Sequence, residues 1–213
     1  MSRLWYRLNQ RFLIRYRIEY LVAVIAVHVV RAISPDLAWR GARDLGSLLW
    51  RGGMRRKVMR ANLAIAFPEK TEAQRDEIGE KTMQHFCCMA VDIFLQTRML
   101  TRGNILKKFT FRGWTQDYMN EHGVAGFRRR ATRVLFLTAH LGNWELASGF
   151  FSLLNIRIDP VFRPPRNPYM ADFIRKIRLD VQSTFIEKRG AVNAMMETLE
   201  EGGNVGFLFD QEA

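Results

Sequence analysis

The chain has 213 residues, of which 48% are hydrophobic and 25% charged, as in an ordinary globular protein that can bury one large core. Its two cysteines, Cys87 and Cys88, are adjacent, which excludes a disulfide framework and fits a reducing compartment. The net charge of +12 is unevenly spread: residues 1–60 hold 13 Lys and Arg against 3 Asp and Glu, a balance of +10, which leaves +2 for residues 61–213. The N-terminal part is therefore expected to meet an anionic surface, either a membrane or a nucleic acid.

The first segment has the pattern of a helix that lies on a membrane surface. Arginines recur every four residues beside an apolar stripe, and these two stripes are Arg3, Arg7, Arg11 and Arg15, and Leu4, Leu8 and Phe12. The apolar run Tyr20–Val30 that follows is shorter than the ~18–20 residues of a spanning helix. A buried core helix and a shallow anchor with snorkelling arginines both fit this run. We expect residues 1–60 to form a basic, helical, membrane-associating region.

The next segment is predicted to be helical as well. Pro68 ends the basic block, because the residue before a proline resists helix formation. Thr71–Gln74, with the sequence TEAQ, has the pattern of a capping box and should begin a long helix that runs towards Leu100. The segment Lys107–Trp114 then has the composition of a short strand.

From residue 134 onward the pattern changes to alternating strands and helices. Val134–Thr138 is apolar without alternation, which is typical of a strand covered on both faces. The later expected strands are Ile158–Arg163, Ser183–Lys188 and Asn204–Phe209, and the expected helices are Asn143–Leu154, Asn167–Arg178 and Gly190–Gly203. This order predicts an α/β fold with a mostly parallel central sheet flanked by helices. The chain ends shortly after the last strand, at FDQEA, so we expect it to be truncated within this domain.

Polar side chains follow the strands of this predicted sheet. His140, Arg163, Lys188 or Arg189, and Asp210 each come at or just after a strand end. Because ligands of open α/β sheets bind at the carboxyl ends of the strands, these side chains are candidates for one common site.

The segment HLGNWE, His140–Glu145, suggests the chemistry of that site. On one continuous helix, His140 and Glu145 would point ~140° apart, but a turn at Gly142 lets the carboxylate swing back to the imidazole. A carboxylate bonded to one ring nitrogen fixes the tautomer and makes the other nitrogen a better base. The segment His140–Glu145 itself contains no serine or cysteine nucleophile, which favours direct acyl or phosphoryl transfer to a substrate alcohol. One histidine and one glutamate are too few ligands for a metal site.

Four motifs in order resemble the lipid A biosynthesis lauroyl/myristoyl (late) acyltransferase family. They are Ala61–Arg75 (ANLAIAFPEKTEAQR), His140–Glu145, Phe162–Arg178 (FRPPRNPYMADFIRKIR) and the block that runs from Arg189 to the Asp-Gln pair at Asp210. The resemblance implies an acyltransferase domain over residues 61–213. It further implies His140 as the base, Glu145 as its partner, and substrate binding by Arg163, by Arg175 or Arg178, and by Asp210. Asn143 is a further substrate-binding candidate, or a helix cap.

The predicted function is transfer of a fatty acyl chain from an acyl thioester, on acyl carrier protein or coenzyme A, to a hydroxyl of a glycolipid such as a lipid A precursor. The chemistry requires no cofactor or metal, because a thioester already carries a reactive carbonyl. We expect the protein at the cytoplasmic face of the inner membrane. The alternatives are a non-catalytic basic protein that binds a membrane surface or a nucleic acid, and an inactive truncated acyltransferase. The balance of only +2 after residue 60 speaks against nucleic acid as a partner.

Overall fold

The structure is a computed structural model, and it describes residues 3–179 and 185–210. The chain divides into two compact units, residues 1–25 with 96–213 and residues 26–95. The predicted boundary after residue 60 divides a membrane-associating region from an acyltransferase domain, and it stays a prediction. Residues 26–95 form the helical unit, which contains α2 (Pro35–Arg51) and α3 (Arg56–Ala66). It also contains the C-terminal end of α1 (Arg3–Ala32) and all but the last residues of α4 (Glu72–Met99).

The helical unit owes its close packing to two glycines. A Cβ atom on Gly79 of α4 would lie 2.3 Å from the ring of Trp50, and one on Gly46 of α2 would lie 2.4 Å from the Cα of Gln84. Since no real side chain tolerates such distances, glycine is what lets α2 and α4 approach. Trp50 is only 3% exposed and forms the centre of this contact.

The predicted start of the long helix is confirmed. The main-chain N–H of Thr71 donates to Oε1 of Gln74 at 2.9 Å, and the N–H of Gln74 donates to Oγ1 of Thr71 at 3.3 Å. This reciprocal pair is the capping box that the TEAQ sequence predicts. The helix then runs to Met99, one residue short of the predicted end.

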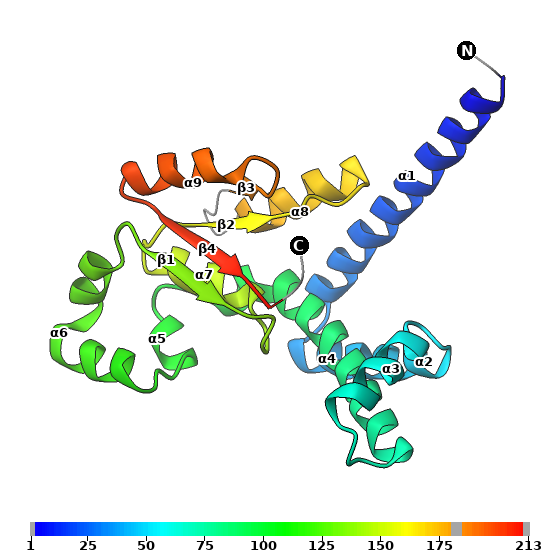
Figure 1. Cartoon of the computed structure of the whole chain (residues 1–213), viewed down its shortest axis with the longest axis horizontal. Helices are drawn as coiled ribbons and strands as arrows, with labels where there is room; N and C mark the ends of the chain where they lie inside the picture. Colours follow the sequence, from blue (N-terminus) through cyan, green and yellow to red (C-terminus); the bar gives the residue numbers. More distant parts are fainter. Residues whose placement is uncertain (1–2, 180–184, 211–213) are drawn as a thin grey trace. The chain divides into compact units, whose positions relative to one another are not determined.

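The second unit is built on a small parallel sheet, which confirms the α/β prediction (Figure 1). Its strands are β1 (Leu135–Thr138), β2 (Ile158–Phe162), β3 (Ile186–Glu187) and β4 (Asn204–Leu208), in the order β1-β4-β2-β3. The helices of this unit are α5 (Ile105–Lys108), α6 (Trp114–Arg130), α7 (Glu145–Leu153), α8 (Pro168–Leu179) and α9 (Ala191–Glu200). All described pairings are parallel, so the carboxyl ends of the four strands lie at one edge.

Helices α7 and α9 cover opposite faces of the sheet. The ring of Phe151 on α7 packs against Phe136 of β1, at 5.1 Å between centroids. On the other face, Thr198 of α9 donates a hydrogen bond to the buried carboxylate of Asp159 on β2. The main cluster of buried side chains consists of Ile105, Phe127, Phe150, Leu154 and Ile156. This core holds the α7 side of the sheet in place.

Two predictions for strands are wrong. Lys107–Trp114 contains the last turn of α5 and the start of α6, and among the described residues it pairs with no strand. Its aromatic side chains pack instead on Phe150, with Phe109 at 4.7 Å and Phe111 at 5.5 Å. The strand β1 is not covered on both faces, because Leu135 and Leu137, which share one face, are 50% and 66% exposed.

Candidate active site

The candidate site begins at the corner between β1 and α7. The main-chain N–H of Leu141 donates to the carbonyl of Ala139 at 2.7 Å, which turns the chain sharply just after the strand. Gly142 follows with φ of +57°, a conformation that favours glycine over residues with a side chain. The turn predicted at Gly142 is therefore present. It places His140 at the carboxyl end of β1 and Glu145 in the first turn of α7.

His140 is held by a carboxylate from the far end of the sequence. Its ring Nδ1 lies 2.8 Å from Oδ1 of Asp210, and its main-chain N–H donates to Oδ2 of the same side chain at 2.9 Å. Asp210 comes two residues after β4, and β4 pairs directly with β1, so the sheet brings together residues that are 70 apart. The two side chains are 28% and 34% exposed, which leaves the pair open to a ligand.

The pair is also fixed in orientation and charge. The indole of Trp144 meets the imidazole edge to face, with 4.6 Å between the ring centroids and 77° between their planes. The two hydrogen bonds from His140 hold the pKa of Asp210 below its usual range, so the carboxylate is ionised near neutral pH. A charged carboxylate at one ring nitrogen is the arrangement that lets the other nitrogen act as a base.

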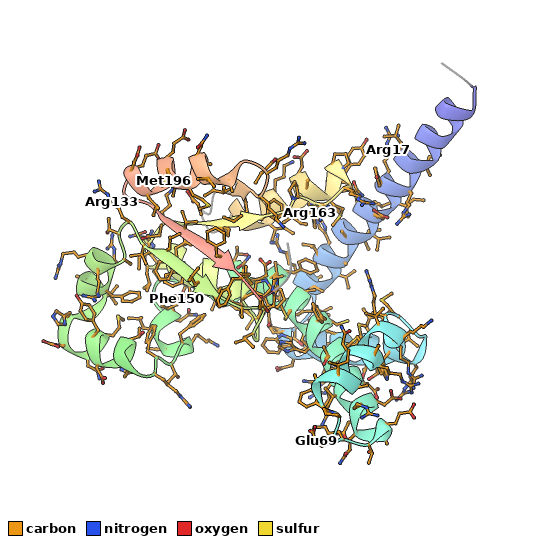
Figure 2. The ribbon with its side chains drawn as sticks, in the orientation of Figure 1. Arg17, Glu69, Arg133, Phe150, Arg163 and Met196 are labelled. Atoms are coloured by element: carbon orange, nitrogen blue, oxygen red, sulfur yellow. The ribbon has the colours of Figure 1, made fainter. Side chains whose placement is uncertain are left out.

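The other candidates lie at the same edge or close to it. Arg163 follows β2 directly, and its side chain is exposed at the arrowhead end of that strand (Figure 2). Within residues 3–179 and 185–210, Arg163 has no ion-pair partner, so it is available to an anionic ligand. Lys188 and Arg189 follow β3 and are exposed as well, and the N–H of Lys188 donates to the carbonyl of Phe162 at 2.9 Å.

Three further candidates are placed in less detail. Arg175 and Arg178 lie on α8, but their side chains are outside the described residues. Asn143 precedes α7, and its carbonyl accepts from the N–H of Leu146 at 3.3 Å. The cap residue of α7 is Trp144, so the interpretation of Asn143 as the cap is one residue off. The substrate-binding roles of all three stay predictions.

The sequence pointed to Glu145 as the partner of His140, whereas the hydrogen bonds above join His140 to Asp210. Glu145 is half-buried at the start of α7, and its role beside the histidine stays a prediction. Two contributions were missed from the sequence. One is the packing of Trp144 on the imidazole, and the other is the buried side chain of Asn167. The second had a visible signal, because an asparagine directly before Pro168 is typical of a helix start.

A histidine–carboxylate pair at the carboxyl ends of the strands of a parallel sheet is an arrangement that can support acid–base chemistry. The family model of the bacterial lipid A biosynthesis acyltransferases matches residues 8–213. This chain belongs to that family, and it is an acyltransferase. A comparison with curated proteins gives no significant match.

Proposed function

We propose that this acyltransferase moves a fatty acyl chain from an acyl thioester directly to a hydroxyl of a glycolipid, such as a lipid A precursor. The donor would be acyl carrier protein or coenzyme A. The observation that carries the proposal is the His140–Asp210 pair at the carboxyl edge of the sheet, in a chain that belongs to the lipid A acyltransferase family.

The proposed reaction uses the two ring nitrogens differently. In this proposal Nδ1 of His140 keeps its proton and donates a hydrogen bond to the carboxylate of Asp210, 2.8 Å away, which leaves Nε2 as the free base. Nε2 removes the proton of the acceptor hydroxyl while the oxygen attacks the thioester carbonyl carbon. The tetrahedral intermediate then collapses, the carbon–sulfur bond breaks, and the thiolate leaves with the proton from the imidazolium. An ester forms, a thiol is released, and His140 returns to its starting state.

The state of the cysteines fits a mechanism without an acyl-enzyme, and the position of Arg163 fits the binding of an anion. The thiols of Cys87 and Cys88 are half-buried, and burial raises the pKa of each, which is the opposite of an activated nucleophile. Arg163 is an exposed cation at the same sheet edge as His140, where it can bind a phosphate of the acceptor or the developing oxyanion. In this proposal Glu145 adds negative charge near the base, and Arg175 or Arg178 contributes to anion binding.

The proposed location is the cytoplasmic face of the inner membrane, held by residues 1–33. Among the described residues, no helix is both long enough and apolar enough to span a membrane. Apolar side chains at helical spacing are nonetheless exposed along α1, and these are Ile14, Ile18, Leu21, Val22 and Ile25. An exposed apolar stripe on a helix rich in arginine is the pattern of attachment in the plane of an anionic membrane.

A transfer assay tests the proposed reaction. The protein is incubated in mixed vesicles with a lipid A precursor and with either acyl carrier protein or coenzyme A carrying a labelled acyl chain. We expect one added acyl ester per acceptor, and a rate of product formation roughly 10²–10⁴-fold lower with the His140→Ala variant. Equal product from the variant and the wild type would contradict the proposal.

A pair of matched substitutions tests the attachment. Val22 on α1 and Val192 on α9 are exposed to a similar degree, at 61% and 67%, so a glutamate at either position should leave the core unchanged. We expect Val22→Glu to weaken sedimentation with anionic vesicles several-fold and Val192→Glu to leave it unchanged. If Val22→Glu sedimented with vesicles as well as Val192→Glu and the wild type do, the anchor would have to lie elsewhere.

A further inference from the structure

Asn167 is a buried polar residue, 5% exposed, in the loop between β2 and α8. Its side chain makes hydrogen bonds with both of its ends. Oδ1 accepts from the N–H groups of Tyr169 and Met170 at 3.0 and 3.4 Å. Nδ2 donates to the carbonyl of Tyr16 at 3.0 Å and to Oε2 of Glu19 at 2.9 Å. One amide therefore joins the start of α8 to a helix about 150 residues earlier in the chain.

The oxygen and the nitrogen of the Asn167 amide have different structural roles. The oxygen caps α8, a task that serine, threonine or aspartate performs as well. The amide nitrogen takes no part in the cap. Of the two polar atoms of this side chain, it is the one that bonds to α1. Among the residues that cap helices well, asparagine is the one that also carries an amide N–H₂, so the contact with α1 explains the choice of residue.

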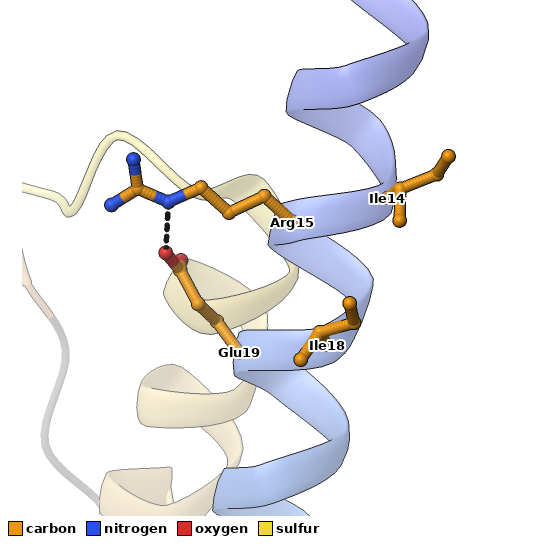
Figure 3. Close-up of a pocket in the computed structure, with 4 residues that line it drawn as sticks. All are labelled: Ile14, Arg15, Ile18 and Glu19. Atoms are coloured by element: carbon orange, nitrogen blue, oxygen red, sulfur yellow. Dashed lines mark hydrogen bonds and ion pairs between the residues drawn. The ribbon is translucent and has the colours of Figure 1, made fainter.

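Other contacts reinforce the same junction. Arg15 forms an ion pair with Glu19 at 2.7 Å, as Figure 3 shows. The hydrogen bond from Asn167, together with Arg15, lowers the pKa of Glu19. The ring of Tyr20 lies 6.1 Å from that of Tyr169 and 5.9 Å from that of Phe173. Residues 15–20 of α1 thus pack on the start of α8.

The side of α1 that contacts α8 differs from the side proposed to meet lipid. In Figure 3, Arg15 and Glu19 extend towards α8, whereas Ile14 and Ile18 extend away from it. Both isoleucines are 56% exposed. The helix is therefore bonded to the sheet unit through one face while the apolar face stays available.

The loop that carries Asn167 also carries Arg163. Only Pro164, Pro165 and Arg166 separate the two residues. The two prolines fix their own φ angles, which makes this short connection stiff. A change in the position of Asn167 should therefore alter the position of Arg163.

We propose that Asn167 is a positioning residue, which ties the Arg163 loop to α1, so that the helix proposed to lie on the lipid surface positions Arg163 to bind a phosphate of the acceptor. This inference rests on the proposed function. It assigns Asn167 no contact with the reacting atoms. Loss of the tie should therefore raise the KM for the glycolipid acceptor and leave kcat and the KM for the donor nearly unchanged.

Asn167→Asp separates the two halves of the amide. The new carboxylate still caps α8, and a helix N-terminus favours its charge. It can no longer donate to Tyr16, however, and it faces the carboxylate of Glu19. Adding Glu19→Gln removes that repulsion and supplies an amide donor from the other side. The matched control is Asn104→Asp, because Asn104 also accepts from a main-chain N–H and donates to a main-chain carbonyl, that of Met99.

Two measurements on the full chain decide the matter. We expect Asn167→Asp to raise the acceptor KM about tenfold with kcat within about twofold, and to speed hydrogen exchange in a peptide that covers residues 13–22. Glu19→Gln in the same chain should recover at least part of both changes, and Asn104→Asp should cause neither.

Three results would overturn the inference. Unchanged exchange in Asn167→Asp would show that the amide does not hold α1. Faster exchange with an unchanged acceptor KM would show that it does not position Arg163. A fall in kcat together with general loss of stability, not recovered by Glu19→Gln, would show a purely structural role. If the wild type transfers no acyl group, the proposed function fails, while exchange still reports whether Asn167 holds α1.

Discussion

The two ends of the same parallel sheet carry polar side chains in opposite circumstances. At the amino end, Asn204 and Asp159 are 2% and 1% exposed. The Asn204 amide accepts from the N–H of Val134 and donates to the carbonyls of Ala131 and Arg157. Asp159 pairs with Arg157 at 2.7 Å. The hydrogen-bonding groups of these two side chains are satisfied within the protein, and they hold the starts of the strands together.

At the carboxyl end, the polar groups are prepared by the chain but remain accessible. His140 and Asp210 are about a third exposed, and Arg163 extends into solvent. A buried, satisfied polar group in this sheet is expected to serve stability, whereas we propose that an exposed and oriented one binds a ligand. Substitutions at the two ends should therefore separate activity from stability.

The largest expected effect is at His140. His140→Ala removes the base and should lower the rate of acyl transfer by roughly 10²–10⁴-fold, the range of general-base catalysis. The melting temperature should stay close to that of the wild type, because the side chain is partly exposed and fills no core. Initial rates and thermal unfolding on the same preparation check this prediction. If His140→Ala were destabilised but kept full activity per folded molecule, the carboxyl end of the sheet would serve stability as the amino end does, and the comparison would fail.

The next effect concerns two carboxylates, that of Asp210, which is bonded to His140, and that of Glu145, its partner as predicted from the sequence. Asp210→Asn keeps the shape but loses the charge that supports an imidazolium, and we expect a rate loss of roughly a hundredfold. The sequence predicts a similar loss for Glu145→Gln. Single-turnover rates of both variants and of the double variant show whether the carboxylates act together. Near-normal turnover in Asp210→Asn would leave the hydrogen bond to His140 without a catalytic role.

At the amino end, the expected effect is on stability. Asn204→Ala leaves the N–H of Val134 and two carbonyls without their side-chain partner in a buried place, which should cost about 2–3 kcal/mol of unfolding free energy. Urea unfolding followed by circular dichroism measures this loss. The rate per folded molecule should remain near that of the wild type, and a selective loss of rate would contradict the comparison.

The smallest effect is a dependence of stability on pH. The folded-state pKa of Asp210 lies below the ordinary value of 3.8, so its ionised form stabilises the fold above that value. This contribution is lost as the pH falls through the lower, folded-state pKa. Asp210→Asn removes this contribution, so it should flatten the acid limb of the stability curve below about pH 4 and slightly lower the stability above it. Identical acid limbs in variant and wild type would argue against the shifted pKa.

Local sequence patterns predicted the elements of this fold better than their arrangement. The capping box at Thr71 and the strand ends before His140, Arg163 and Asp210 follow from turn, cap and period signals, which act over a few residues. The strand order β1-β4-β2-β3 does not, because any parallel order suits the same apolar runs. For this reason the sequence could place Asp210 at the correct edge, but not beside His140.

The errors have the same origin. Phe109 and Phe111 gave Lys107–Trp114 the composition of a strand, yet these aromatic side chains are used in packing against Phe150. The apolar run of β1 predicted burial on both faces, but the face that carries Leu135 and Leu137 is exposed. Burial depends on neighbours that are distant in sequence, and local patterns carry no information about them.

The central claim is that His140 activates the acceptor hydroxyl for direct transfer, and one measurement tests it most directly. The wild-type protein is incubated with an acyl thioester donor that carries a labelled chain, without acceptor, and the denatured protein is analysed by mass spectrometry. Direct transfer predicts unmodified protein, and ester product only after the glycolipid acceptor is added. A stoichiometric acyl adduct that passes to the acceptor would contradict direct transfer and require a nucleophile of the protein's own.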